Sequence, residues 1–180
     1  MTFFRLKRSL LLTLGGMLVS GGVLAQVTEA ELKAAFLFNF TKFVEWPAES
    51  LATTPGSLNV CLFGPRDAYF DAIHELNGKP VKSRNLSVRA VGRGEAPRNC
   101  QVLVMAESEA DQFETVLKRL SGTPVLTVNG AGHFLDAGGI IGFAMEGDKL
   151  RFDINLTAAR RGNLELSSNL LRLARQVRRP

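Results

Sequence analysis

The segment "CQVLVMAESEADQFETVLKRLSGTPVLTV" (residues 100–128) decides the fold. Its two ends, residues 100–106 and 123–128, are short apolar runs typical of strands. The first is almost continuously apolar, as expected for a strand that is covered on both faces. Between them, residues 108–122 predict a helix with Ser108 and Asp111 as capping residues. Its inner face is formed by four apolar residues at helical spacing, namely Phe113, Val116, Leu117 and Leu120. Strand, helix and strand in this order predict a parallel sheet.

The flanking sequence extends this pattern in both directions. Strands are predicted at 57–64 and 86–91, and a helix at 65–78. Residues 138–156 predict an antiparallel hairpin that turns at Gly147-Asp148. A last helix is predicted from Ser167, with Leu170, Leu173, Ala174 and Val177 inside and arginines at its end. The predicted fold class is therefore α/β, a three-layer sandwich whose mainly parallel sheet is extended by an antiparallel C-terminal hairpin.

An aromatic segment, "KAAFLFNFTKFVEWP" (residues 33–47), predicts another helix. Thr28 and Glu31 form a capping box before it, and Pro47 ends it. One face collects Leu32, Phe36, Phe40 and Phe43, which we expect to pack on the sheet. Phe38 points away from this face. It is a candidate contact for a dimer mate or partner, and the alternative is a solitary surface aromatic.

The N-terminus has the pattern of a secretory signal peptide. A basic start is followed by an apolar run from Leu10 to Leu24 and small residues before Gln26. We expect residues 1–25 to be cleaved, leaving one domain over 26–180; an uncleaved membrane anchor is the alternative. Removing three of the 22 basic residues, against 17 acidic ones, leaves a net charge of +2. This charge does not favour nucleic-acid binding.

The chain has two cysteines, Cys61 and Cys100. In an exported protein such a pair favours a disulfide over two buried thiols. Other chemistry is sparse. His74 and His133 have no Cys or His neighbour at metal-ligand spacing, and we expect neither a metal, a cofactor nor a catalytic constellation. A small polar ligand could bind weakly at the carboxyl rim of the sheet, at residues 64–66, 107–108 and 129–130.

Several segments together resemble the YfiR-like family of bacterial periplasmic proteins. They are "KAAFLFNFTKFVEWP", "LNVCLFG" (58–64), "CQVLVM" (100–105), "PVLTV" (124–128) and "RFDINLTAARRGNLELSSNLLRLAR" (151–175). The resemblance implies a non-enzymatic periplasmic regulator that restrains an inner-membrane diguanylate cyclase by binding its periplasmic sensor domain. Cyclic-di-GMP output, and with it biofilm formation, would fall. An outer-membrane OmpA-like lipoprotein would sequester the regulator, and homodimers are expected.

The resemblance also implies a partner-facing surface in the C-terminal part of the domain. The matching positions are Asp153, Asn155, Arg160 and Arg161. Strand alternation places Asp153 and Asn155 on the non-core face; the alternative is an ordinary solvated strand face. Some members carry a second cysteine pair near the hairpin, which this chain lacks. The partner could also be another membrane sensor protein. An alternative function is a periplasmic small-molecule receptor that feeds a sensor kinase or a transporter.

Overall fold

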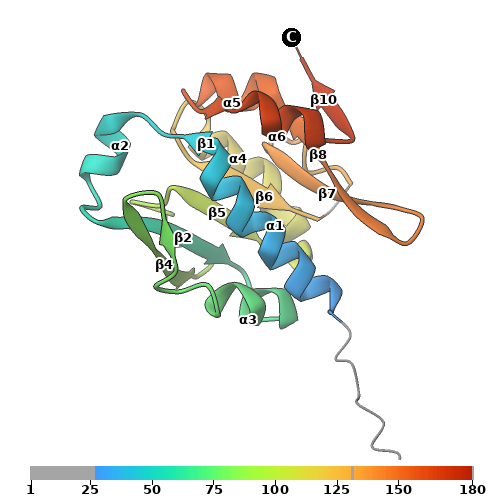
Figure 1. The fold of residues 1–180 in the computed structure, drawn as a ribbon, viewed down its shortest axis with the longest axis horizontal. Helices are drawn as coiled ribbons and strands as arrows, with labels where there is room; N and C mark the ends of the chain where they lie inside the picture. The colour runs from blue at the N-terminus through green and yellow to red at the C-terminus, as the bar shows by residue number, and fades with distance from the viewer. Residues whose placement is uncertain (1–26, 131, 180) are drawn as a thin grey trace, which may run out of the picture.

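The fold, a computed structural model, is described for residues 27–130 and 132–179. Its described residues form an eight-stranded sheet in the order β10-β8-β7-β6-β5-β2-β4-β3 and a small sheet of β1 and β9 (Figure 1). The strands are β1 (Val44–Glu45), β2 (Ser57–Phe63), β3 (Pro80–Val81), β4 (Arg84–Val91), β5 (Val102–Met105), β6 (Leu126–Asn129), β7 (Ile141–Glu146), β8 (Lys149–Asn155), β9 (Glu165–Leu166) and β10 (Gln176–Arg178). The helices are α1 (Glu29–Phe43), α2 (Ala48–Ala52), α3 (Ala68–His74), η1 (Glu107–Gln112), α4 (Phe113–Leu120), α5 (Leu156–Arg161) and α6 (Ser168–Leu173).

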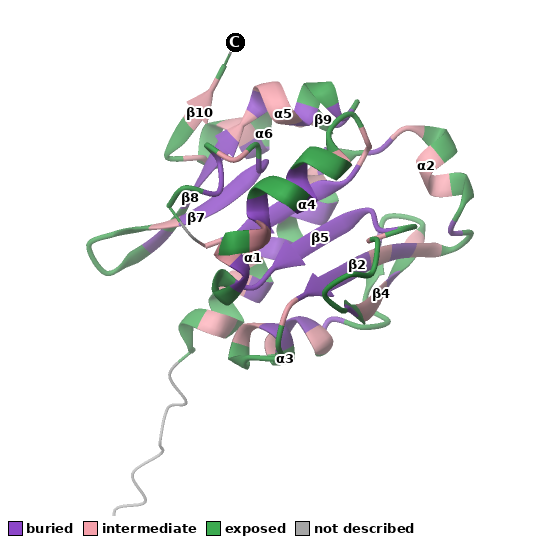
Figure 2. Ribbon diagram, turned by 180° about the vertical axis from the view of Figure 1, so that it is seen from behind, coloured by how far each residue is buried: buried purple, intermediate pink, exposed green. Residues whose placement is uncertain are grey.

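The centre of the large sheet is parallel. Strands β4, β2, β5, β6 and β7 run in one direction, whereas β8 pairs antiparallel with β7 as the second strand of the hairpin. Helices cover both faces. α1 lies in front of the sheet in Figure 1, and α4 lies in front in the reverse view of Figure 2. α3 contributes Phe70 and Ile73 to the same core as α1. The predicted α/β sandwich is therefore confirmed.

Alternate residues of the central strands serve two separate cores. On β2, Val60 and Leu62 belong to the core beneath α1, whereas Cys61 and Phe63 belong to the core beneath α4. This division explains why the strands show apolar runs without polar alternation. The α1 core has an aromatic centre, in which the ring of Phe40 lies 4.9 Å from that of Phe152. Burial of such a side chain contributes about 1.5–3 kcal/mol.

The predicted capping box of α1 is confirmed. The hydroxyl of Thr28 accepts a hydrogen bond from the Glu31 amide (3.2 Å), and the Glu31 carboxylate accepts one from the Thr28 amide (2.7 Å). The predicted core face is only partly right. Phe40 is fully buried, but Leu32 is 39% exposed, and Leu37 is buried in its place. Because α1 packs against α3 as well as the sheet, its buried stripe is rotated toward α3.

Three helix predictions are wrong in detail. Pro47 does not end the first helix, because α1 stops at Phe43 and the next two residues pair with β9 as β1. The last helix ends at Leu173, which is 65% exposed, and residues 176–178 form β10 instead. β10 pairs parallel with β8, and the backbone amide of Arg175 donates to the Phe152 carbonyl (2.9 Å). Pairing with the sheet edge replaces the helix. The segment after β5 begins as the 3₁₀ helix η1, and neither Ser108 nor Asp111 caps it or α4.

Candidate functional site

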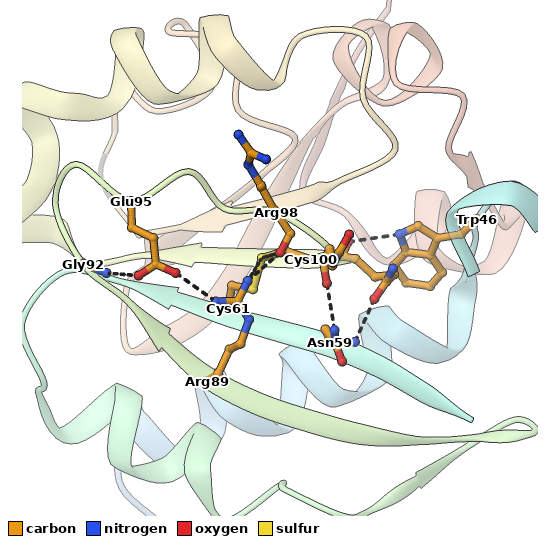
Figure 3. The surroundings of a disulfide bond; sticks show 10 residues. Trp46, Asn59, Cys61, Arg89, Gly92, Glu95, Arg98 and Cys100 are labelled. Atoms are coloured by element: carbon orange, nitrogen blue, oxygen red, sulfur yellow. Dashed lines mark hydrogen bonds and ion pairs between the residues drawn. A yellow bond between two sulfur atoms is a disulfide. The ribbon is translucent and has the colours of Figure 1, made fainter. Parts of the chain in front are cut away.

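The predicted disulfide joins Cys61 in β2 to Cys100 just before β5, with a Cα–Cα distance of 5.8 Å. β2 and β5 are neighbouring parallel strands, which brings the two cysteines together. From β4, Arg89 donates to the Arg98 carbonyl (2.5 Å) and lies 3.4 Å from the Cys100 sulfur (Figure 3). The disulfide and Arg89 together attach the loop after β4 to the sheet.

Asp153 lies on the non-core face of β8 as predicted, but its side chain is covered, and its contact with a partner stays a prediction. Its side chain lies on the opposite side of β8 from Phe152 and Ile154, as alternation predicts, but it is only 7% exposed. The guanidinium of Arg175 forms a two-point ion pair with it, in which Nε lies 2.9 Å from Oδ1. The hydrogen bond to Asp153 raises the pKa of Arg175 above its usual value. The pair attaches the C-terminal segment to the sheet edge.

Asn155 has a local structural role as well. It is the N-cap of α5, and its side-chain oxygen accepts a hydrogen bond from the Ala158 amide (3.0 Å). Its side-chain nitrogen donates to the Leu135 carbonyl (3.2 Å). The side chain is half-buried, and its contact with a partner stays a prediction. These bonds fix the direction in which α5 leaves the sheet.

Arg160 and Arg161 lie in the last turn of α5 and are both exposed. Neither forms an ion pair or hydrogen bond through its side chain with a described residue. Arg161 lines a hollow of about 240 Å³ between α5 and the C-terminal end of α4. Their exposure leaves both side chains accessible, and their contact with a partner stays a prediction.

Phe38 lines an open groove of about 670 Å³ between α1 and α3. The ring is half-buried, and the ammonium of Lys42 lies 4.1 Å from its centre. Ala35 and Ala72 contribute to the same groove. The aromatic face of Phe38 is therefore covered in part by its own helix neighbour. Its role in assembly stays a prediction.

At the carboxyl rim, Glu109 occupies the space that sequence reasoning assigned to a ligand. Only 2% of Glu109 is exposed, and its carboxylate lies 2.7 Å from Nε of Arg93. A Cβ placed on Gly64 would approach the Glu109 side chain to 2.8 Å, so the crevice after β2 is filled. The helical pattern of 108–122 did not mark Glu109 as buried. Gly64, which lies opposite Glu109, belongs to a segment distant in sequence.

A pocket that sequence reasoning missed lies at the opposite, amino-terminal end of β5 and β6. It has a volume of about 440 Å³ and lies between α2, the loop before β5 and the turn after α4. Arg98 and Arg119 line it, together with Cys100 of the disulfide. Arg98 and Cys100 lie in the loop before β5, whereas Arg119 lies in the last turn of α4. No sequence spacing connects these segments.

The YfiR/HmsC-like family model matches residues 30–175, most of the chain. This chain belongs to the YfiR/HmsC-like family. The family is one of periplasmic regulators of cyclic-di-GMP signalling. The disulfide between Cys61 and Cys100 fits a periplasmic location. The predicted signal peptide lies outside the described residues.

Solved structures with a similar fold are larger than this YfiR/HmsC-like chain. One is the ABC domain in complex with L-Trp from Streptococcus pneumoniae, with a TM-score of 0.55 and 12% identity over 83% of this chain and 60% of that one. Another is a conserved domain protein from Vibrio cholerae O1 biovar El Tor, with a TM-score of 0.53 and 12% identity over 84% of this chain and 61% of that one. At this identity the likeness concerns the fold alone.

Two further observations on this YfiR/HmsC-like chain concern metals and membranes. Over residues 27–130 and 132–179, no group of three or more His, Cys, Asp or Glu side chains is placed to hold a metal ion. Within the same residues, no helix has the length and apolar character that crossing a membrane requires.

Proposed function

We propose that this protein binds the periplasmic sensor domain of a membrane-bound diguanylate cyclase and holds the enzyme in an inactive form. Membership in the YfiR/HmsC-like family is the observation that carries the proposal. Restraint requires tighter binding to the inactive form of the cyclase than to the active form, because equal affinity would shift no population. The regulator itself performs no chemistry in this scheme.

The exposed arginines of α5 are the contact residues that we propose. Arg160 and Arg161 are exposed and unpaired within the described structure, so an acidic partner surface would meet them without first breaking an ion pair. Asp153 and Asn155 would support this surface indirectly. Asn155 caps α5, and Asp153 pairs with Arg175 in the segment after α6. Another membrane sensor protein with an acidic periplasmic surface would fit the same arginines.

The test replaces both arginines in one variant, Arg160→Glu/Arg161→Glu. We expect binding to a purified periplasmic cyclase domain to weaken at least about tenfold, with most of the change in the association rate and its salt dependence. A matched control is Lys149→Glu, an exposed cation at the start of β8 without an ion pair among the described residues. In cells, the double variant should raise cyclic-di-GMP to the level of a deletion strain. A double variant that still represses fully would refute this surface.

Two further interactions belong to the same proposal. An outer-membrane OmpA-like lipoprotein would relieve repression by sequestering the regulator, and pull-down from solubilised envelopes tests this directly. The regulator would act as a homodimer, with Phe38 at or near the contact between copies. Light scattering of wild type and Phe38→Glu at matched concentrations tests the dimer.

A second candidate function is small-molecule reception for a sensor kinase or a transporter. The observation that favours it is the pocket of about 440 Å³ beside the disulfide, a volume in the range of known ligand sites.

A further inference from the structure

The pocket beside the disulfide has an apolar wall and a basic rim. Pro97, Leu120, Pro124 and Val125 supply much of the wall. None of the residues that line the pocket is Asp or Glu. An apolar body of a ligand would therefore find a surface to pack against, and a negative charge would meet no repulsion from a lining side chain.

The cations of this pocket are Arg98 and Arg119, which are both exposed. Neither guanidinium has a hydrogen bond or an ion pair with a residue that the structure describes. The backbone carbonyl of Arg98 accepts from Arg89, whereas its guanidinium points away from the Arg89–Glu95 network (Figure 3). The disulfide at Cys100 holds the loop that carries Arg98 to the sheet. Arg119 lies in the last turn of α4, a helix that packs on the sheet through Phe113 and Leu117.

An adjoining hollow repeats the same charge pattern. The hollow lined by Arg161 shares Leu120, Thr123 and Val125 with the pocket, contains Lys118, and again has no Asp or Glu in its lining. Elsewhere in the described structure many arginines are neutralised; the ion-paired ones are Arg66, Arg89, Arg93, Arg151, Arg175 and Arg178. Uncompensated positive charge therefore gathers around the turn that follows α4.

The end of α4 does not cancel this charge. A helix C-terminus repels anions through its free carbonyl groups. Here the Lys118 carbonyl accepts from the Ser121 amide (3.3 Å), and the Leu120 carbonyl accepts from the amide (2.9 Å) and the hydroxyl (2.6 Å) of Thr123. These bonds satisfy two of the carbonyl groups at the end of α4, which reduces the repulsion that they would exert on an anion.

We propose that this pocket binds a small amphipathic anion. Its apolar body would lie against the proline, leucine and valine wall, and its carboxylate, sulfonate or phosphate group would lie between Arg98 and Arg119. Guanidinium groups bind such oxyanions through paired hydrogen bonds. The proposal does not rest on the restraint of a cyclase, and the test below uses the regulator alone.

The test compares two fluorescent probes of similar aromatic shape, 8-anilinonaphthalene-1-sulfonate and neutral N-phenyl-1-naphthylamine, on the folded, oxidised protein. We expect the sulfonate to bind at one site and at least about tenfold more tightly than the neutral probe. In Arg98→Gln/Arg119→Gln this preference should disappear, because the sulfonate loses affinity while the neutral probe keeps it. The control Lys149→Gln removes an exposed charge far along the chain and should leave both affinities unchanged.

A second variant tests the location of the site. Thr53 lies at the pocket edge and is exposed, so Thr53→Trp should be tolerated by the fold and should block both probes. Decanoate should displace the sulfonate from the wild type, whereas decanol should not. Two outcomes would overturn the proposal. One is that Lys149→Gln loses as much sulfonate affinity as Arg98→Gln/Arg119→Gln; the other is that the double variant binds the sulfonate as tightly as the wild type at an unchanged melting temperature. Either outcome leaves the cyclase experiment unaffected.

Discussion

The variant Cys61→Ala/Cys100→Ala removes the disulfide and tests how much this bond contributes to the free energy of unfolding. The two cysteines are 39 residues apart in sequence. In the chain-entropy model, a closed loop of this length lowers the entropy of the unfolded chain by an amount worth about 4 kcal/mol at room temperature. Since domains of this kind are stable by about 5–15 kcal/mol, the variant should lose a large share of its stability.

Urea denaturation followed by tryptophan fluorescence measures this loss. Trp46 is the one tryptophan of the chain, and its indole N–H donates to the carbonyl of Gln101, the residue after Cys100. With an m-value of about 2 kcal/mol per M, the midpoint should fall by about 2 M urea. The urea midpoint of wild-type protein in reductant should fall by a similar amount. This control distinguishes loss of the disulfide from the effect of replacing two cysteines by alanine. A loss below about 1 kcal/mol in both samples would refute the loop-closure reasoning and assign the loop's order to the Arg89 contacts instead.

Three further predictions concern single side chains. Phe40→Glu places a charge in the α1 core and should abolish cooperative thermal unfolding, whereas Phe38→Glu should keep it and change only assembly, as calorimetry and light scattering would show. Asp153→Ala should lower the melting temperature and speed amide exchange in residues 176–178, because Arg175 loses its partner; unchanged exchange would contradict this. Burial raises the pKa of Tyr69, the one tyrosine of the chain. The free energy of unfolding should therefore be independent of Tyr69 ionisation below the unfolded pKa of about 10, and it should fall as the pH rises above that value. Tyrosinate absorbance should therefore appear only as the chain unfolds, while urea-unfolded protein titrates normally.

Much of the fold follows from local sequence because its signals act over a few residues. The capping box at Thr28 and Glu31 needs only one helical turn, and it is present as predicted. The apolar run around Val102 and Val104 reports that helices cover both faces of that strand. Helical spacing also continues through Val177, but the helix predicted there is absent and residues 176–178 form β10. A sheet edge distant in sequence, at β8, offers pairing that outweighs the local preference.

The candidate site depends more on contacts between distant segments. Alternation placed Asp153 on the correct side of its strand, but its burial arises from Arg175, which returns 22 residues later. The buried Glu109 is explained by Gly64 and Arg93, which lie in other segments. Patterns of one segment could not reveal either neighbour.

By itself, the sequence determined the α/β class, the cysteine pair and the family. Each of these depends on residue type and short-range spacing. The tertiary structure alone decided which polar residues are committed to internal bonds and which cations stay unpaired. It brought Arg98 and Arg119 to one pocket from two separate segments. The physical reason is that burial and ion pairing depend on distances in space, which the packing of α4 and its loops against the sheet sets.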